Sequence, residues 1–460
     1  MSTYVELIAD NIINTSFQNF AQENLENAKY RILDVLGCAI GGVNAAGNAE
    51  LINLIKTWGG REEATIFVCG GKASAHNVAM VNSVLARSYD FEATQARVKN
   101  VNLASHVSGT TVPTALALGE ANNAGGKELI TALLIGDDVA CRVLAASGFG
   151  FTLGWDNVGT VNALGATAIA GRLLGLNKKQ LQNAFGIVLN QLSGSFEAIW
   201  DGASSFKLLQ GLSARNGIFS AELARFGWTG PKDALLGKFG YFNLYTEGCR
   251  NPEILIEDLG KSYYTEVTYK PYPCCRANHA AIDCALNLVR DYDIIPDDIE
   301  HIVLKVPRAM FHMFVSQPFS VGDIPQIGAG FNMRYCVANV LLRKNITLEH
   351  FQEEYVRDER IAKICAKIAL EELNEDELKN NTACLKVIMN DGKEYISGVK
   401  GAKGDPVLSP LSVDEIKTKF MENISFSRKI SEANGEKIIN IVENLEEVDD
   451  LNDLIGLLTV

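Results

Sequence analysis

The hydrophobic pattern changes near residue 266, and this change constrains the fold more than any other feature of the chain. Before it, apolar residues recur at the helical period, as in the stripe Ala28, Ile32, Leu36 and Ile40. Further helical runs cover about 74–88, 110–121, 127–146, 160–174, 178–191 and 211–226. Residues 1–268 are therefore predicted to form an all-helical domain.

After residue 266, strand patterns and helix patterns alternate. Apolar residues occupy every second position in 302–306 and 385–389, and the second run leads into Asn390-Asp391-Gly392. An Asp-Gly pair after such a run is typical of a β-hairpin. Helical runs at about 276–290 and 331–343 lie between the two strands.

These patterns predict two domains. Residues 269–404 form the smaller, α+β domain, and the helical pattern returns from about 411 to 456. We expect residues 405–460 to complete the first domain. The predicted fold class is mainly α, with a large all-helical domain and a smaller α+β domain. A chain of 460 residues is also too long for one compact core.

Charge and hydropathy exclude several classes of protein. The formal net charge of −13 argues against a general nucleic-acid binder, which needs a basic face. No run of about 18 apolar residues predicts a membrane-spanning helix. The N-terminus lacks the basic region of a secretory signal. We therefore expect a cytoplasmic protein without nucleic-acid or membrane partners.

Cofactor and metal motifs are missing from the sequence. There is no Walker loop, no dinucleotide-binding glycine motif, no nucleophile elbow and no HExxH. None of the six histidines lies within four residues of another, which disfavours a His-based metal site. The ten cysteines do not form a disulfide framework, and Cys274 and Cys275 are adjacent rather than spaced as CxxC. We expect neither a metal nor a cofactor.

Ionisable residues gather in four loop segments between helices. In chain order, these segments hold Asp90 with His106, Asp156, Lys207, and Lys270 with Arg276 and His279. Each has a plain structural explanation when taken singly. A polar residue beside His106 can cap the following helix, most lysines are solvated, and a histidine on an apolar helix is more often a core residue.

Taken together and in order, these segments resemble the MmgE/PrpD family along essentially the whole chain. The resemblance rests on Asp90-Phe91 with His106, Gly159-Thr160, Lys207 with Gly211 and Ala214-Arg215, Lys270-Pro-Tyr-Pro-Cys-Cys with His279, Gly404-Asp405-Pro406, and Lys419-Phe420. It implies a large helical domain with an α+β lid, usually in a homodimer. The family includes 2-methylcitrate dehydratases, cis-aconitate decarboxylases and an iminodisuccinate epimerase.

The resemblance also implies site residues. Asp90, His106, Lys207 and Lys270 would be catalytic, and His279 and Tyr335 would contact the substrate. Asp156 and Arg276, which lie in the same loop segments, are further candidates for substrate contact. His106 would transfer the proton, because an unperturbed pKa of about 6.5 suits acid–base catalysis near neutrality. Asp90 would orient it. The two lysines, with Arg276 as a third cation, would stabilise negative charge on carboxylate oxygens.

The chain departs from the family pattern at three places. Members typically carry His after Gly-Trp, where this chain has Asp156. Glu92 stands in a segment that usually reads Asp-Phe-Asp-Asp-Thr-His, and Val107 replaces the usual Pro. An anion at position 156 would repel a substrate carboxylate unless it is protonated or paired.

The predicted function is a cofactor-independent lyase of small polycarboxylic acids, similar to a 2-methylcitrate dehydratase or a cis-aconitate decarboxylase. One alternative is an epimerase or isomerase of an acidic substrate on the same scaffold, in which Asp156 would be a second proton acceptor. Another is a non-catalytic relative that binds a small molecule.

Overall fold

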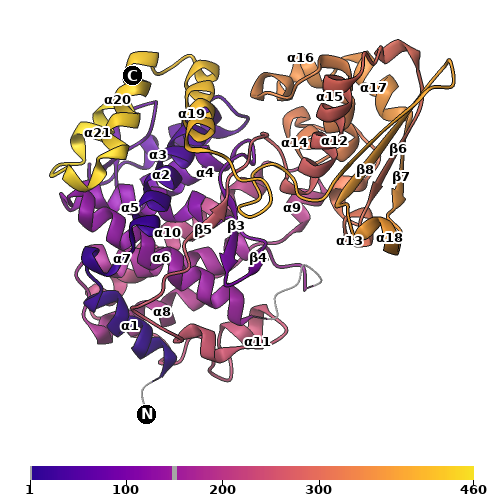
Figure 1. Cartoon of the computed structure of the whole chain (residues 1–460). Helices are drawn as coiled ribbons and strands as arrows, with labels where there is room; N and C mark the ends of the chain where they lie inside the picture. Colours follow the sequence, from indigo (N-terminus) through magenta and orange to yellow (C-terminus); the bar gives the residue numbers. More distant parts are fainter. Residues whose placement is uncertain (1–2, 148–152) are drawn as a thin grey trace.

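The computed structural model describes residues 3–147 and 153–460, which form a large helical lobe and a smaller lobe that contains a sheet (Figure 1). Each lobe has its own hydrophobic core. This two-domain, mainly helical architecture confirms the predicted fold class. No helix within the described ranges is long and apolar enough to cross a membrane. The ten cysteines are free, and most of them are buried.

Long helices make up most of the large lobe. They are α1 (Tyr4–Asn14), α2 (Gln22–Gly42), α3 (Asn48–Trp58), α4 (Ala75–Arg87), α5 (Ser108–Ala121), α6 (Gly126–Ala146), α7 (Val161–Leu173), α8 (Lys178–Leu189), α10 (Ser205–Arg225) and the short α11 (Tyr241–Tyr245). Helix α10 packs against α4 and α7 at the centre. Because α5 and α7 are buried on nearly every side, apolar and small residues are spread around both helices rather than along one stripe.

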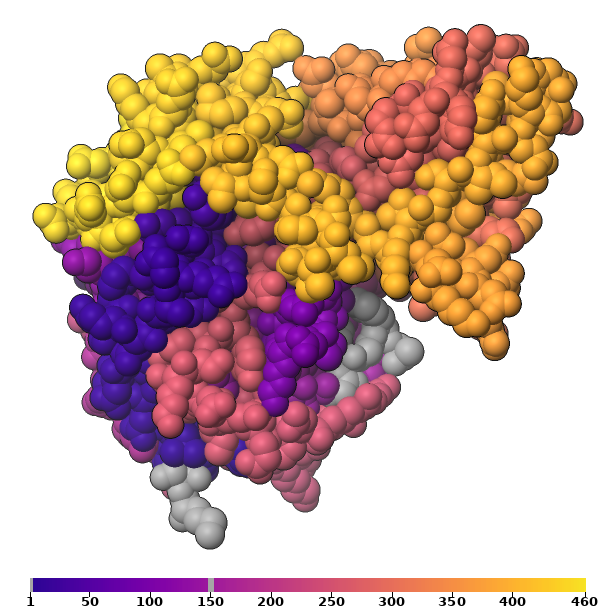
Figure 2. Space-filling model, in the orientation of Figure 1, coloured from indigo at the N-terminus to yellow at the C-terminus, as the bar shows by residue number. Residues whose placement is uncertain are grey.

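The end of the chain returns to the large lobe. Helices α19 (Val413–Ser427), α20 (Glu432–Glu443) and α21 (Asn452–Leu457) contribute to the same core as α2. Helix α19 packs directly on α2. Figure 2 shows these C-terminal helices in yellow over the indigo N-terminal part, with the orange small lobe projecting to one side.

Two small antiparallel sheets add to the lobe that the sequence predicts to be all-helical. One pairs β1 (Ala64–Thr65) with β2 (Lys72–Ala73), and the other has the order β4 (Val101–Leu103), β3 (Thr94–Val98), β5 (Glu266–Thr268). Strands of two to five residues are too short to show a periodic pattern. The second sheet matters for the site, because β3 follows Asp90 and β5 leads to Lys270.

The small lobe is built on a four-stranded sheet. Its order is β7 (Ile368–Glu372), β6 (Ile299–Val306), β8 (Ala383–Met389), β9 (Glu394–Val399), with β6 parallel to β7 and antiparallel to β8. The predicted hairpin is confirmed, because β8 and β9 pair across Gly392, whose φ of 81° suits glycine. Strand β7 was not predicted.

Helices cover this sheet and fill the rest of the small lobe. They are α12 (His279–Asp291), α13 (Arg308–Phe311), α14 (Pro325–Gly330), α15 (Met333–Arg343), α16 (Glu353–Val356), α17 (Glu359–Ala366) and α18 (Glu375–Leu378). Helix α12 packs on β8 and β9. The short α9 (Glu197–Trp200) and the start of α10 add Ile199 and Phe206 to the core of this lobe.

The chain crosses between the lobes after β5 and again after β9 (Figure 1). The two crossing segments touch, because a Cβ atom on Gly404 would lie 2.1 Å from the carbonyl oxygen of Tyr269. Gly404 also has a φ of 92°, so glycine is needed for both space and backbone conformation.

Candidate active site

A cavity of about 520 Å³ opens between the two lobes. On the large-lobe side it is lined by Arg87, Asp90, Thr94, His106, Asp156 and Asn157, among others. The small lobe contributes Cys275, Arg276 and Lys400, and Asp405 of the segment that returns to the large lobe also lines the cavity. An apolar wall is formed by Phe196, Ile199, Met310, Met313, Phe314 and Phe331. A few polar groups converging in a largely apolar cleft are typical of a small-molecule site.

The turn that follows α4 brings the acidic residues of the site together. Its backbone closes through the Asp90 N–H, which donates to the Arg87 carbonyl at 2.9 Å. Asp90 has a φ of 49°, in the left-handed region that Asp enters more readily than most residues. Glu92 follows the turn and is fully buried. Both carboxylates therefore face the end of α4, where Arg87 lies.

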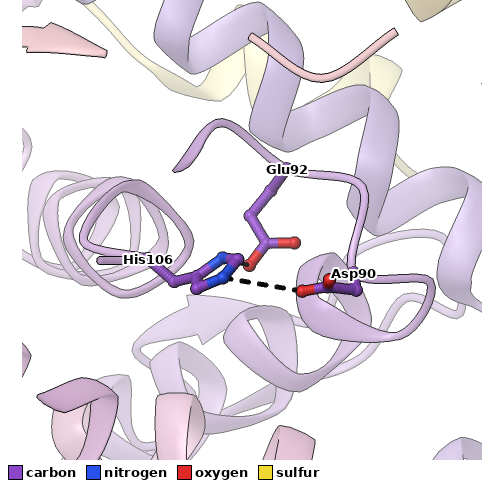
Figure 3. A group of neighbouring side chains, drawn as sticks. All are labelled: Asp90, Glu92 and His106. Atoms are coloured by element: carbon purple, nitrogen blue, oxygen red, sulfur yellow. Dashed lines mark hydrogen bonds and ion pairs between the residues drawn. The ribbon is translucent and has the colours of Figure 1, made fainter. Parts of the chain in front are cut away.

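Arg87 contacts the three other polar groups at the centre of the site. Its Nη1 atom donates to Glu92 Oε1 at 3.0 Å, lies 2.7 Å from His106 Nδ1, and forms an ion pair with Asp90. Figure 3 shows the side chains of Asp90, Glu92 and His106 pointing toward one another. His106 Nδ1 lies 3.1 Å from Glu92 Oε1, and its Nε2 lies 3.6 Å from Asp90 Oδ1.

The partners of His106 constrain its tautomer. A guanidinium group can only donate, so Nδ1 of the neutral ring accepts from Arg87. The proton of the neutral ring is then on Nε2, facing Asp90 Oδ1. When the ring gains a second proton at Nδ1, that N–H finds an acceptor in Glu92 Oε1 at 3.1 Å. The site is thus built to hold His106 in either protonation state.

Burial and nearby charges shift the pKa values in this cluster. Burial, with the cations Arg87 and Lys270, lowers the pKa of His106, although Asp90 opposes the shift. Burial would raise the pKa of Glu92, but Arg87 and the hydrogen bond with His106 lower it well below its ordinary value. For Asp90, burial is likewise outweighed by Arg87 and Lys270, and its pKa is lowered. At neutral pH, His106 is therefore neutral and both carboxylates are ionised.

Lys270 completes the cluster from the other side. It follows β5, is fully buried, and places Nζ 2.9 Å from Asp90 Oδ2. The same ammonium group donates to the Asp90 carbonyl. Two cations, Arg87 and Lys270, thus balance the carboxylates of Asp90 and Glu92. The cluster is neutral overall until His106 is protonated or an anion enters the cavity.

Asp156 enters the cavity from a different loop. It is 4% exposed and caps the short 3₁₀ helix Asn157–Gly159, accepting from the Val158 N–H at 3.0 Å. None of the described cations lies within ion-pair distance of its carboxyl group. Burial raises the pKa of Asp156, with Arg87 opposing. Burial therefore favours the protonated acid more than water does.

Arg276 lies on the small-lobe wall of the cavity. It donates to the carbonyls of Lys403 at 2.6 Å and Ala402 at 3.1 Å, and approaches His279 Nδ1 at 3.2 Å. It forms no ion pair within the described part of the chain. Burial lowers its pKa, but a guanidinium group stays charged in proteins. Its positive charge is thus available to a ligand. Lys400 lines the same wall.

Four predicted site residues, Lys207, Lys270, His279 and Tyr335, do not line the cavity that the structure describes, although Lys270 contacts Asp90, which does. Lys207 donates to the Ala46 carbonyl at 2.5 Å and to Asn48 Oδ1 at 2.7 Å, and burial lowers its pKa to about 8. His279 is fully buried beside the Cys274 carbonyl, and the Tyr335 hydroxyl donates to the His350 carbonyl in the small-lobe core. Their predicted roles stay predictions.

Two residues of the cluster, Arg87 and Glu92, were not predicted from the sequence as site residues. Arg87 lies in the last turn of a predicted helix, where a cation needs no explanation beyond the helix dipole. Glu92 was noted only as a departure from a pattern. For Arg87, the available signal was its spacing from Asp90, because the two residues are three positions apart at the end of a helix.

The cluster is a poor fit for a metal ion. Asp90, Glu92 and His106 place possible ligand atoms within 4.8 Å of one another. However, Arg87 Nη1 already contacts all three side chains. A metal cation there would face a buried guanidinium group at close range, and the repulsion between like charges disfavours binding.

Comparisons with known proteins match most of the length of the chain. The model of the MmgE/PrpD N-terminal domain matches residues 6–253, and that of the MmgE/PrpD C-terminal domain matches residues 272–447. Human cis-aconitate decarboxylase is 28% identical over 83% of this chain and 78% of its own. A cis-aconitate decarboxylase of Aspergillus terreus is 24% identical over 97% and 94%. A cis-aconitate decarboxylase-like protein of Aspergillus oryzae is 23% identical over 95% and 93%.

Proposed function

The chain belongs to the MmgE/PrpD family, and we propose that it is a lyase that acts on a small polycarboxylic acid by proton transfer beside a carboxylate. One observation carries the proposal. A neutral His106, held between two ionised carboxylates and the guanidinium of Arg87, opens on a cavity with further cations on its opposite wall. Because several relatives bear the name cis-aconitate decarboxylase, we favour loss of CO2 over loss of water.

The chemistry needs one proton-transfer group and fixed positive charge. When CO2 leaves, the electron pair of the broken C–C bond stays on the substrate skeleton, and carbon takes up one proton. When water leaves instead, a carbon-bound proton is removed and hydroxide departs with a proton. Both reactions build negative charge on carboxylate oxygens, which preorganised donors stabilise by roughly 3 kcal/mol each.

His106 is the proposed proton-transfer group. In the neutral ring, Arg87 fixes Nδ1 as an acceptor, and in the protonated ring Glu92 stabilises the Nδ1–H. Asp90 faces Nε2, and Lys270 holds Asp90 in place from behind. General acid–base catalysis by a positioned side chain typically contributes about 10²- to 10⁴-fold.

The substrate carboxylates are proposed to bind between the lobes. Arg276 and Lys400 offer positive charge on the small-lobe wall. Asp156 is proposed to be protonated and to donate a hydrogen bond to a carboxylate, which removes the repulsion expected from an anion at this position. The hydrogen bond that Asp156 accepts from the Val158 N–H keeps its carboxyl group oriented.

One observation favours a second candidate function. Asp156 and His106 both line the cavity, so two proton-transfer groups are available to a single substrate. An epimerase or isomerase of an acidic substrate needs two such groups, one for each face of the reacting carbon. A non-catalytic binding relative is the third reading, and the charge-balanced cluster around His106 argues against it.

Several further predictions belong to the same proposal. We propose that the reaction needs neither metal nor cofactor, because His106 and the surrounding cations supply the chemistry described above. A cytoplasmic homodimer is proposed, and the half-exposed Trp58 and the largely exposed Phe226 on the large lobe would suit a subunit contact. The domain boundaries are proposed at residues 269 and 404.

Proton NMR in D2O tests the function. The protein is incubated with cis-aconitate, 2-methylcitrate, citrate, iminodisuccinate and smaller dicarboxylates. A new vinyl signal supports a lyase, and the product tells decarboxylation from dehydration. Deuterium entering beside a carboxylate in an unchanged skeleton supports the epimerase. Binding without any turnover across the panel would overturn both in favour of a binding protein.

A further inference from the structure

A buried ion pair lies behind the turn that carries Asp90 and Glu92. Lys419 of α19 and Asp34 of α2 are 5% and 2% exposed, and Lys419 Nζ lies 2.6 Å from Asp34 Oδ1. The two residues are 385 positions apart in the sequence. Neither lines the cavity that the structure describes, and the chemistry proposed above does not use them.

Both partners of this pair also bind the backbone of the turn. Lys419 Nζ donates to the Phe91 carbonyl at 2.7 Å, and the Ala93 N–H donates to Asp34 Oδ2 at 2.8 Å. The ammonium group also lies 3.9 Å from the centre of the Phe91 ring. The pair thus binds the backbone on both sides of Glu92, through the Phe91 carbonyl before it and the Ala93 N–H after it.

The turn needs such support. Asp90 has a left-handed backbone, which a non-glycine residue keeps only when its surroundings hold it there. Glu92 is a fully buried carboxylate at the end of an irregular segment. If the backbone around it shifted, its carboxylate would leave both Arg87 and His106, because each contact depends on a distance near 3 Å.

We propose that Asp34 and Lys419 are positioning residues, which hold the backbone from Phe91 to Ala93 so that the carboxylates of Asp90 and Glu92 stay against His106. The effect of the two residues on catalysis rests on the proposed function. Their effect on the positions of the Asp90 and Glu92 carboxylates does not. The pair also makes the C-terminal helix α19 part of the site, although the small lobe separates it from the turn in sequence.

The same helix α2 offers a matched control. Lys29 is 7% exposed and forms an ion pair with Glu446 at 2.5 Å, and it also donates to the Glu443 carbonyl at 2.8 Å. This ion pair connects α2 to the C-terminal segment, as the pair of Asp34 and Lys419 does. None of its contacts, however, involves the turn that carries Asp90 and Glu92. If both ion pairs only stabilised the fold, removing either pair would have a similar effect on the pKa of His106 and on turnover.

The test compares two double variants that each remove both charges of a pair. Asp34→Asn with Lys419→Met acts on the turn, and Lys29→Met with Glu446→Gln is the control. Removing both partners avoids leaving one buried charge alone. The protein is labelled with ¹³C-histidine, His106 is assigned through His106→Gln, and its pKa is measured by NMR titration together with turnover and the thermal midpoint.

We expect the first variant to lower the pKa of His106 by about half a unit or more. The charged groups that surround His106 are Arg87, Lys270, Asp90, Glu92 and Asp156. Only the carboxylates of Asp90 and Glu92 move with the turn, so the ring loses the anions that raise its pKa and keeps the cations. Turnover should fall about tenfold or more, and the control should change neither quantity.

Two results would overturn the proposal. One is an unchanged His106 pKa in the folded first variant, and the other is an equal shift in the control. If the first variant does not fold, Lys419→Met alone decides in the same way, because it removes the donor to the Phe91 carbonyl while burial lets Asp34 take up a proton. A wild-type protein that turns over nothing would count against the proposed function only, since the titration needs no substrate.

Discussion

Glu92 Oε1 lies 3.1 Å from His106 Nδ1, closer than the 3.6 Å that separates Asp90 Oδ1 from Nε2. The sequence predicted Asp90 as the residue that orients the histidine. In the structure Glu92 is the nearer carboxylate, and it faces the nitrogen that is unprotonated in the neutral ring. Glu92 is therefore the group that would stabilise an imidazolium formed during catalysis.

Glu92→Gln should reduce kcat about 100-fold, because the amide keeps the shape but cannot balance a protonated His106. The pKa of His106 should also fall, since an anion beside the ring is lost. Steady-state kinetics and the histidine titration measure both effects. Glu120→Gln is the control, because Glu120 is 7% exposed and binds Thr65 at 2.8 Å and 2.6 Å, outside the cavity lining. Equal losses in the two variants would contradict a role specific to His106.

Asp156→Asn should keep turnover within about threefold of the wild type. The asparagine amide can still donate to a carboxylate, as the protonated acid is proposed to do, and its oxygen can still accept from Val158. Asp156→Ala, which removes both functions, should lose far more. If Asp156→Asn were instead as inactive as the alanine variant, Asp156 would be a proton acceptor and the epimerase would be favoured.

Arg276→Met should raise KM about 10- to 100-fold and change kcat much less. A cation that binds the substrate equally in the ground state and the transition state affects binding rather than the chemical step. Lys403→Met is the matched control, because Lys403 is close in space but its ammonium donates to Pro410 and Glu415 instead. A kcat defect without a KM change would place Arg276 at the reacting atoms.

His350 should make the stability depend on pH. Burial, with Arg343 nearby, lowers its pKa to about 4 in the folded chain, whereas the unfolded value is about 6.5. As the pH falls from 6.5 toward 4, the unfolded chain binds this proton first, so the free energy of unfolding decreases. The contribution is fully present above pH 6.5.

His350→Gln removes that proton-binding difference. The thermal midpoint of the variant should fall less between pH 7 and pH 5 than that of the wild type. The comparison uses the slope with pH, because the substitution also removes the contact between His350 Nδ1 and the Thr347 N–H at 3.4 Å. Parallel slopes would show that His350 has the same pKa in the folded and unfolded chains.

The long elements were predictable because each repeats one pattern over many residues. Helix α6 and the hairpin β8–β9 follow their expected ranges closely. The strands β3, β4, β5 and β7 are three to five residues long. Strands β3, β5 and β7 pair with partners distant in sequence, and β4 pairs with β3 across a tight turn. Local periodicity cannot show such strands.

The site was predictable only in part, for a related reason. Asp90, His106 and Lys270 stand in recognisable segments, and the structure brings them together. Arg87 and Glu92 reach them only through the left-handed turn at Asp90, and the modest preference of Asp for that conformation does not locate the turn in the sequence. Lys207 was expected in the cavity, but the face of α10 that carries it points to Ala46 and Asn48. The pair of Asp34 and Lys419 depends on how α19 packs on α2.

The central claim is that His106 transfers a proton at a carbon beside a carboxylate. The most direct measurement is proton NMR of cis-aconitate and 2-methylcitrate in D2O, with the wild type and His106→Gln at matched concentration and confirmed thermal midpoints. The account predicts a vinyl product from the wild type and none from the folded variant. Wild-type-like turnover by His106→Gln would contradict it.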